Sequence, residues 1–156
     1  MTVSLRKASL DDAELIWRMQ AIAFKPLLDK YQDYDYSPAL ETLERTIYRM
    51  QLPIADHWLI LLDGAPIGGI GIGRYEGFLK LKRLFILPEY QNRGYAQKAV
   101  RLAESNYPAA SRWELDTILQ EEKLCHLYEK LGYRQTGKIR PLKEGMDLVF
   151  YEKSIQ

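Results

Sequence analysis

The chain has one cysteine, no excess of either charge and no long hydrophobic run. Because Cys125 has no second cysteine to pair with, no intrachain disulfide can form, which favours a reducing, cytoplasmic location. The 22 basic and 21 acidic residues nearly cancel, so the basic excess typical of nucleic-acid binding is missing. No apolar run approaches the roughly 18 residues of a membrane-spanning helix. We therefore expect a soluble protein that binds neither nucleic acid nor membrane.

The length and the hydrophobic content predict one domain over residues 1–156. A chain of 156 residues with 47% hydrophobic residues can bury a sizeable core without a metal or a disulfide. It contains no internal repeat, low-complexity segment or interdomain linker.

The first third of the chain predicts one strand and two helices. A strand at residues 3–7 leads into a helix whose apolar stripe reaches Phe24. Residues 25–36 are aromatic and acidic without a clear period, which predicts a loop. A second helix is predicted between Pro38, a favourable first helical residue, and Gln51.

The remaining segments complete a mixed fold. Strands are predicted at residues 58–62, 66–74, 78–87, 113–117, 133–139 and 146–152, and helices at residues 96–106 and 124–131. The turn Asp63-Gly64 is a strong hairpin signal, so the first three of these strands form an antiparallel meander. The predicted class is α/β of the α+β type, with a mixed, mostly antiparallel sheet of about seven strands flanked by about four helices.

The segment from Pro88 to Ala96 has the features of an anion site. An apolar strand runs into Pro88, and Gln91 to Ala96 stand where a helix begins. Free backbone N–H groups and the helix dipole can hold a pyrophosphate there, and Gly94 allows its close approach. Arg93 adds a positive charge. On these residues alone, an ordinary strand-to-helix turn is the favoured interpretation, because short glycine motifs match by chance.

Other phosphate motifs are missing. The run Gly68-Gly69-Ile70-Gly71-Ile72-Gly73 neither opens a helix nor is followed by Gly-Lys-Ser/Thr, so it is typical of a strand whose glycines allow close packing. A nucleotide-dependent ligase or kinase would need such a loop and an acidic metal-binding signature. We therefore expect no metal.

Three segments resemble one family. Gln91-Asn92-Arg93-Gly94-Tyr95-Ala96 resembles the Gln/Arg-x-x-Gly-x-Gly/Ala signature of the GNAT superfamily of N-acetyltransferases. Residues 5–13 are similar to its first strand–helix unit, and residues 127–133 to its Leu-Tyr-x-Lys-x-Gly-Phe/Tyr segment. Three matches in the right order, spread over almost the whole chain, are far more specific than any one of them.

The resemblance implies a bound acetyl-coenzyme A as co-substrate. In this family the fourth strand of the sheet splays from the fifth, and coenzyme A enters the split. The implied cofactor-binding residues are Leu84, Phe85 and Ile86 along the pantetheine arm, and Gln91, Asn92, Arg93, Gly94, Tyr95 and Ala96 around the pyrophosphate.

The resemblance also implies an acid. Tyr128 matches the family tyrosine that protonates the departing thiolate, although a core aromatic residue would show the same spacing. Many relatives place a glutamate base on the fourth strand, where this chain has only Lys80, Leu81, Lys82 and Arg83. Glu76 and Asp116 are the remaining candidates, and an amine that arrives uncharged would need no base.

The helix that bears Tyr128 departs from the family pattern at two positions. Glu121 and Leu124 stand where many members have an asparagine and an alanine, which removes support for pantetheine contacts there. Cys125 has no suitably spaced histidine and acid to activate it, so a small buried hydrophobic residue is the better interpretation than an acyl carrier.

The acceptor is expected to bind at the segment after the first helix. A cage with aromatic faces and negative charge, suited to a cationic amine, could be formed by Phe24, Tyr31, Tyr34, Asp35 and Tyr36, and these residues could equally cover the edge of the core. The resulting hypothesis is direct acetyl transfer from acetyl-coenzyme A to a small-molecule or peptide amine. A non-catalytic coenzyme A-binding regulatory module is the alternative, because the fourth-strand glutamate is missing. A homodimer is compatible with the apolar stripes.

Overall fold

The computed structural model describes residues 1–155, and in this part of the chain it shows seven β-strands and four α-helices. The strands are β1 (Val3–Lys7), β2 (Ala55–Leu62), β3 (Ala65–Tyr75), β4 (Phe78–Ile86), β5 (Arg112–Ile118), β6 (Arg134–Lys143) and β7 (Met146–Ser154). The helices are α1 (Ala13–Tyr31), α2 (Leu43–Met50), α3 (Tyr95–Ser105) and α4 (Glu122–Lys130). The predicted order of strands and helices is confirmed.

All of these strands belong to one sheet, in the order β1-β2-β3-β4-β5-β7-β6. Neighbouring strands are antiparallel except β4 and β5, which run parallel. The predicted Asp63-Gly64 turn joins β2 to β3, with Gly64 at a φ of 87° that favours glycine. The mixed, mostly antiparallel sheet confirms the predicted fold class.

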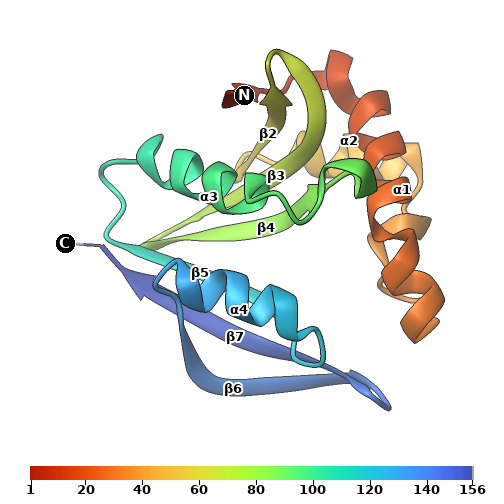
Figure 1. Ribbon diagram of the computed structural model, residues 1–156, viewed down its shortest axis with the longest axis vertical. Coiled ribbons are helices and arrows are strands. Elements are labelled where there is room, and N and C mark those ends of the chain that lie inside the picture. The colour runs from red at the N-terminus through yellow and green to blue at the C-terminus, as the bar shows by residue number, and fades with distance from the viewer. Residues whose placement is uncertain (156) are drawn as a thin grey trace.

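Different helices cover the two faces of the sheet, α3 and α4 on one and α1 and α2 on the other (Figure 1). Leu59 and Ile60 of β2 are both fully buried, and they belong to different core clusters. Successive strand residues point to opposite faces, so each strand supplies both layers. The cluster under α3 and α4 includes Ile60, Ile70, Leu81, Ala99, Val100, Leu115, Tyr128 and Leu131. The cluster under α1 and α2 is smaller and consists of Ile16, Met19, Leu59 and Phe85.

The first helix corrects the expected loop over residues 25–36, because α1 continues through Pro26 to Tyr31. A proline inside a helix removes one backbone hydrogen bond and costs ~3 kcal/mol. Tertiary contacts offset this cost: Phe24 packs edge-on against Phe85, with ring centroids 5.8 Å apart. At the C-terminus of the helix, the Lys143 Nζ donates to the carbonyl oxygen of Tyr31 at 2.7 Å, which satisfies an end carbonyl.

The second helix begins later than predicted. Pro38 starts a short 3-10 helix that ends at Leu40, and α2 starts only at Leu43. Thr42 caps it, because its Oγ1 accepts a hydrogen bond from the Arg45 amide at 3.1 Å. The two residues between these helices, Glu41 and Thr42, therefore have extended backbones, which turns the Glu41 side chain inward.

None of the helices within residues 1–155 is both long and apolar enough to cross a membrane.

Candidate active site

The site begins where β4 and β5 part. These parallel strands are paired only at Leu79 with Trp113 and at Lys80 with Glu114. Beyond Lys80 they diverge, as Figure 1 shows for the ends of β4 and β5 that point toward α1. The edge of β4 over residues 81–86 therefore has no partner strand on this side, and its backbone polar groups are available to a ligand.

A β-bulge shapes the same stretch of β4. Gly69 of β3 is opposite Phe85 and Gly71 is opposite Lys82, so β4 has one extra residue between these pairs. Arg83 lies in that interval with a φ of 49°, an uncommon value for a residue with a side chain. The bulge re-aims the backbone and side chains of Arg83 and Leu84 at the place where the two strands diverge.

A groove of about 410 Å³ lies along this free edge. Its walls come from α1, the end of β4, the start of α3 and the start of α4. The groove residues are Ala23, Phe24, Pro26, Leu27, Leu84, Phe85, Ile86, Tyr90, Gln91, Asn92, Gly94, Tyr95, Ala96, Gln97, Glu121, Lys123, Leu124 and Leu127. They include every expected cofactor-binding residue except Arg93, whose exposed side chain lies outside the groove lining.

The loop before α3 presents free backbone N–H groups to the groove. Among the described residues, the amides of residues 92–97 have no acceptor, and the first helical hydrogen bond runs from the Lys98 amide to the Gly94 carbonyl at 3.2 Å. Gly94 has a φ of 82°, and no atom lies within 4 Å of the position of an added Cβ. The Gln91 Nε2 donates to the Ile86 carbonyl at 2.8 Å and fixes the loop to β4. Free amides at the start of a helix are a geometry that suits an anion.

A cavity of about 330 Å³ lies next to the groove. Phe24, Leu27, Leu84 and Leu124 line both spaces, so the two are adjacent. The cavity also contains polar groups from five elements or loops: Asp33, Tyr36, Arg83, Asp116, Tyr128 and Arg140.

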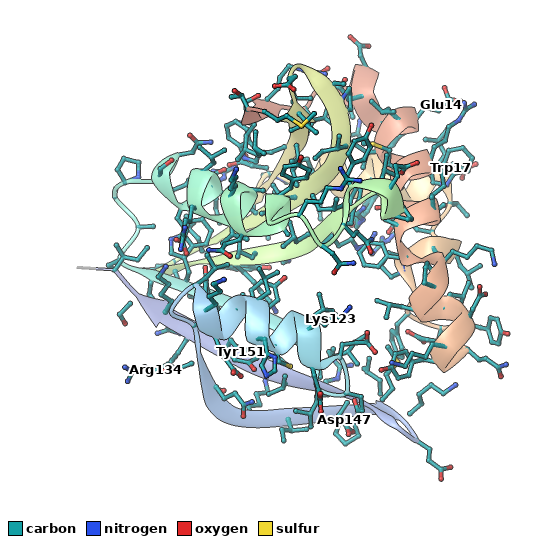
Figure 2. The ribbon with its side chains drawn as sticks, viewed as in Figure 1. Glu14, Trp17, Lys123, Arg134, Asp147 and Tyr151 are labelled. Atoms are coloured by element: carbon teal, nitrogen blue, oxygen red, sulfur yellow. The ribbon has the colours of Figure 1, made fainter. Side chains whose placement is uncertain are left out.

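Tyr128 lies on the cavity wall as a protonated phenol. It packs against Tyr133 and Tyr151, with ring centroids 6.1 and 6.4 Å away, and Tyr151 lies between α4 and the sheet in Figure 2. Burial raises the pKa of the Tyr128 hydroxyl, and the negative charge of Asp116 raises it further. The group is therefore neutral at pH 7 and able to donate a proton.

Of the two candidate bases, one lies on the cavity. Asp116 lines it, and its Oδ2 forms an ion pair with the Lys80 Nζ at 2.8 Å. Glu76 lies in the exposed turn between β3 and β4, at the other end of β4 from the bulge, and lines neither the groove nor the cavity. The fold does not bring Glu76 together with the other candidates.

Comparison with known proteins identifies the family. The model of the acetyltransferase (GNAT) family matches residues 17–133, three quarters of the chain. The chain belongs to the GNAT acetyltransferase family. This confirms the resemblance found at Gln91 to Ala96. No curated protein sequence gives a significant match.

Solved structures share the GNAT fold at low identity. The chain is similar to an acetyltransferase from Thermus thermophilus, with a TM-score of 0.78 and 19% identity over 99% of this chain and 98% of that one. It is also similar to the ribosomal-protein-S18-alanine N-acetyltransferase from Escherichia coli (TM-score 0.79, 13% identity, 99% and 95% covered). A third is the spermidine N-acetyltransferase from Vibrio cholerae in complex with CoA and spermine (TM-score 0.76, 15% identity, 97% and 95% covered).

The expected acceptor residues are only partly brought together in this GNAT protein. Phe24 lines the cavity, whereas the exposed Tyr34 and Asp35 do not. Because α1 extends to Tyr31, the following turn directs Tyr36 to the cavity, as expected, together with Asp33, which was not expected there. Asp33 is buried, and its Oδ1 accepts a hydrogen bond from the Tyr36 amide at 3.1 Å.

Tyr31 has a different role, because it ties α1 to the start of α4. Its hydroxyl donates to the Glu121 Oε2 at 2.5 Å, and the Lys30 Nζ lies 2.6 Å from the same oxygen. These contacts hold the unusual Glu121 at the groove wall. The neighbouring Lys123, which the sequence analysis did not select, is a groove cation on the side of α4 toward α1 (Figure 2). Cys125 is buried, as expected.

A buried ionic network behind Arg83 was also not anticipated. Glu41 accepts hydrogen bonds from the Arg49 Nε at 2.9 Å and the Thr46 hydroxyl at 2.7 Å, and it lies 2.7 Å from the Arg83 Nη1. Burial raises the pKa of Glu41, but hydrogen bonds from Arg49, Thr46 and Gln20 and the charge of Arg83 outweigh it and lower the pKa to about 2. The network joins α1, α2 and the β4 bulge.

This network predicts acid sensitivity. The pKa of Glu41 is lower in the folded protein than its ordinary value of 4.5, so its stabilising contribution is complete above pH 4.5 and is lost as the pH falls toward about 2. We expect Glu41→Gln to lower the free energy of unfolding at pH 7 by roughly 3 kcal/mol, because Arg49 and Arg83 lose their shared partner. Between pH 5 and pH 3, the free energy of unfolding should decrease less in Glu41→Gln than in the wild type.

Urea denaturation across this pH range measures both effects. Glu44→Gln is the matched control, because it removes the same charge from an exposed position in the first turn of α2. If the free energy of unfolding fell equally with pH in the wild type and in Glu41→Gln, the carboxylate of Glu41 would not be the source of the acid sensitivity.

Proposed function

We propose that residues 1–156 form one N-acetyltransferase domain that moves an acetyl group from acetyl-coenzyme A to the amine of a small molecule or peptide. The observation that carries the proposal is that the groove and the cavity adjoin each other at Leu84 and Leu124. A donor lying in the groove and an acceptor lying in the cavity would meet at these residues. Family membership supports the reaction class.

The donor fits the groove in two parts. Its pyrophosphate would accept hydrogen bonds from the free amides of residues 92–97, and the open space at Gly94 permits close approach. Its pantetheine arm would run along the unpaired edge of β4 at residues 84–86, where amide groups of the ligand replace the missing strand. Lys123 supplies a positive charge on the opposite wall.

Transfer would proceed by direct attack. The uncharged amine attacks the thioester carbonyl carbon, a C–N bond forms, and the C–S bond breaks. Tyr128 donates its phenolic proton to the departing thiolate and is reprotonated from solvent. N–H groups on the edge of β4 that has no partner strand would stabilise the charge that develops on the carbonyl oxygen.

The proton released by the amine needs an acceptor. Asp116 lines the cavity and lies close enough to Tyr128 for its charge to raise the pKa of the phenol, so we propose Asp116 as the base. The ion pair with Lys80 at 2.8 Å holds this carboxylate in place, and the proton would reach it through a water molecule. The alternative of a non-catalytic binding module is not favoured, because the family and the structural neighbours are acetyltransferases.

Tyr128→Phe tests the acid. We expect kcat to fall by roughly 100-fold, because the thiolate loses its proton donor, with acetyl-coenzyme A affinity nearly unchanged. Thiol release with an amine panel gives the rate. Tyr133→Phe is the matched control: it removes a hydroxyl that bonds to Glu104 at 2.8 Å, in the same aromatic cluster but off the cavity. Unchanged kcat in Tyr128→Phe at every pH would overturn the assignment.

Gly94→Val tests the pyrophosphate loop. A β-branched side chain disfavours the φ of 82° and occupies the open space, so we expect acetyl-coenzyme A affinity to fall at least about tenfold. Gly77→Val is the control, because Gly77 has a φ of 85°, equally open surroundings and a place in the remote β3–β4 turn. Calorimetric titration with acetyl-coenzyme A should separate the two variants, and equal affinities would contradict the proposal.

A further inference from the structure

The acceptor cavity has an unequal distribution of compensated and free charges. Asp116 is paired with Lys80 at 2.8 Å, and Arg83 with Glu41 at 2.7 Å. Within residues 1–155, Arg140 and Asp33 have no ion-pair partner, although the Asp33 carboxylate accepts the Tyr36 amide. The cavity therefore offers both an uncompensated cation and an uncompensated anion to whatever binds there.

Arg83 has unused hydrogen-bond donors at this cavity. Its Nη1 lies 2.7 Å from Glu41 and 3.5 Å from the Gln20 Oε1, whereas its Nη2 and Nε have no acceptor among the described residues. The side chain is 27% exposed and lines the cavity. A guanidinium held on one side by a buried carboxylate has its direction fixed, and its free N–H groups suit a second carboxylate.

The network behind Arg83 also has an excess of positive charge. Arg49 and Arg83 share the single carboxylate of Glu41. His57 is neutral at pH 7, since burial and the charge of Arg49 lower its pKa to about 4. One positive charge of the network therefore remains uncompensated in a largely buried position, where an anionic ligand is strongly favoured over a cationic one.

The rest of the cavity wall is apolar. Its hydrocarbon residues come from α1, β6, β7 and the end of β5, and they are Leu27, Leu28, Ile118, Leu142, Met146 and Leu148. A cavity of about 330 Å³ with such walls suits one compact hydrocarbon group rather than a long polar chain.

We propose that the acceptor bears a carboxylate a few bonds from its amine, as an apolar amino acid does, and that Arg83 binds this carboxylate. Arg83 is adjacent to Leu84, the residue shared by groove and cavity, so an acceptor anchored at Arg83 has its amine beside the thioester. The side chain of the acceptor lies against the apolar wall. This inference rests on the proposed function and specifies its substrate class. Polyamines are poorer acceptors, because they have no carboxylate for Arg83 to bind.

Matched acceptor pairs test the proposal. Thiol release from acetyl-coenzyme A is measured with leucine, methionine and phenylalanine, with their carboxamides, and with spermidine, at equal concentrations of uncharged amine. We expect kcat/KM to be roughly 10- to 100-fold higher for each acid than for its amide, the range for a hydrogen bond to a charged group. Amides or spermidine that react as fast as the acids would overturn this inference alone. Thiol release with none of these amines, nor with any other amine, would overturn the proposed function as well.

A pair of arginine variants locates the carboxylate site. In Arg83→Gln the ratio of kcat/KM for an acid to kcat/KM for its amide should fall toward 1, because the KM for the acids rises. Arg45→Gln is the matched control, because it removes an arginine charge from an exposed position on α2 that does not line the cavity, and it should keep the preference. An undiminished preference in Arg83→Gln would contradict the assignment.

A measurement on the wild-type protein does not depend on the folding of these variants. 4-Methylpentanoate, which has the leucine skeleton without the amine, should inhibit competitively against the amine acceptor, and 4-methylpentanamide should not. Equal inhibition by both compounds would overturn the role of Arg83.

Discussion

The separation of β4 from β5 is the constraint on which the rest of the site depends. Only Leu79 and Lys80 of β4 are paired with β5, and a continuous parallel ladder would bury the edge that the groove uses. The sheet tolerates the missing pairing between β4 and β5 because each strand keeps an antiparallel partner on its other side, β3 for β4 and β7 for β5. The unpaired backbone groups of β4 then stay in reach of solvent or ligand, which satisfies their hydrogen bonds.

The bulge at Arg83 connects this opening to the ionic network. An extra residue in β4 places Arg83 at a positive φ, a conformation that persists only when its surroundings favour it. Glu41 provides that support, since it is held by Arg49 and Thr46 from α2 and reaches the Arg83 guanidinium. The helices α1 and α2 thus do more than cover a sheet face: they fix the strand segment at which groove and cavity meet.

The residues expected at the donor site come together in the structure more completely than those expected at the acceptor site, because the two sites need different numbers of chain segments. The proposed donor loop from Gln91 to Ala96 is contiguous, and it would act through backbone amides whose geometry Gly94 and the helix start determine. The order of strands and helices was equally readable from local periodicity. The extent of α1 was not, because the packing of Phe24 on Phe85 outweighs the local signal of Pro26.

The acceptor cavity combines side chains from α1, the turn after it, β4, β5, α4 and β6, which no local pattern relates. Asp33 lines it while Tyr34 and Asp35 do not, a choice that depends on the left-handed residue Gln32 ending α1. Arg83 stands in the polar run Lys80-Leu81-Lys82-Arg83, which predicts only a strand with an exposed face. The bulge alone turns Arg83 to the cavity, because without the extra residue the alternation of the strand would place its side chain differently. A one-residue irregularity in β4 therefore decides which charge an acceptor in this cavity would meet.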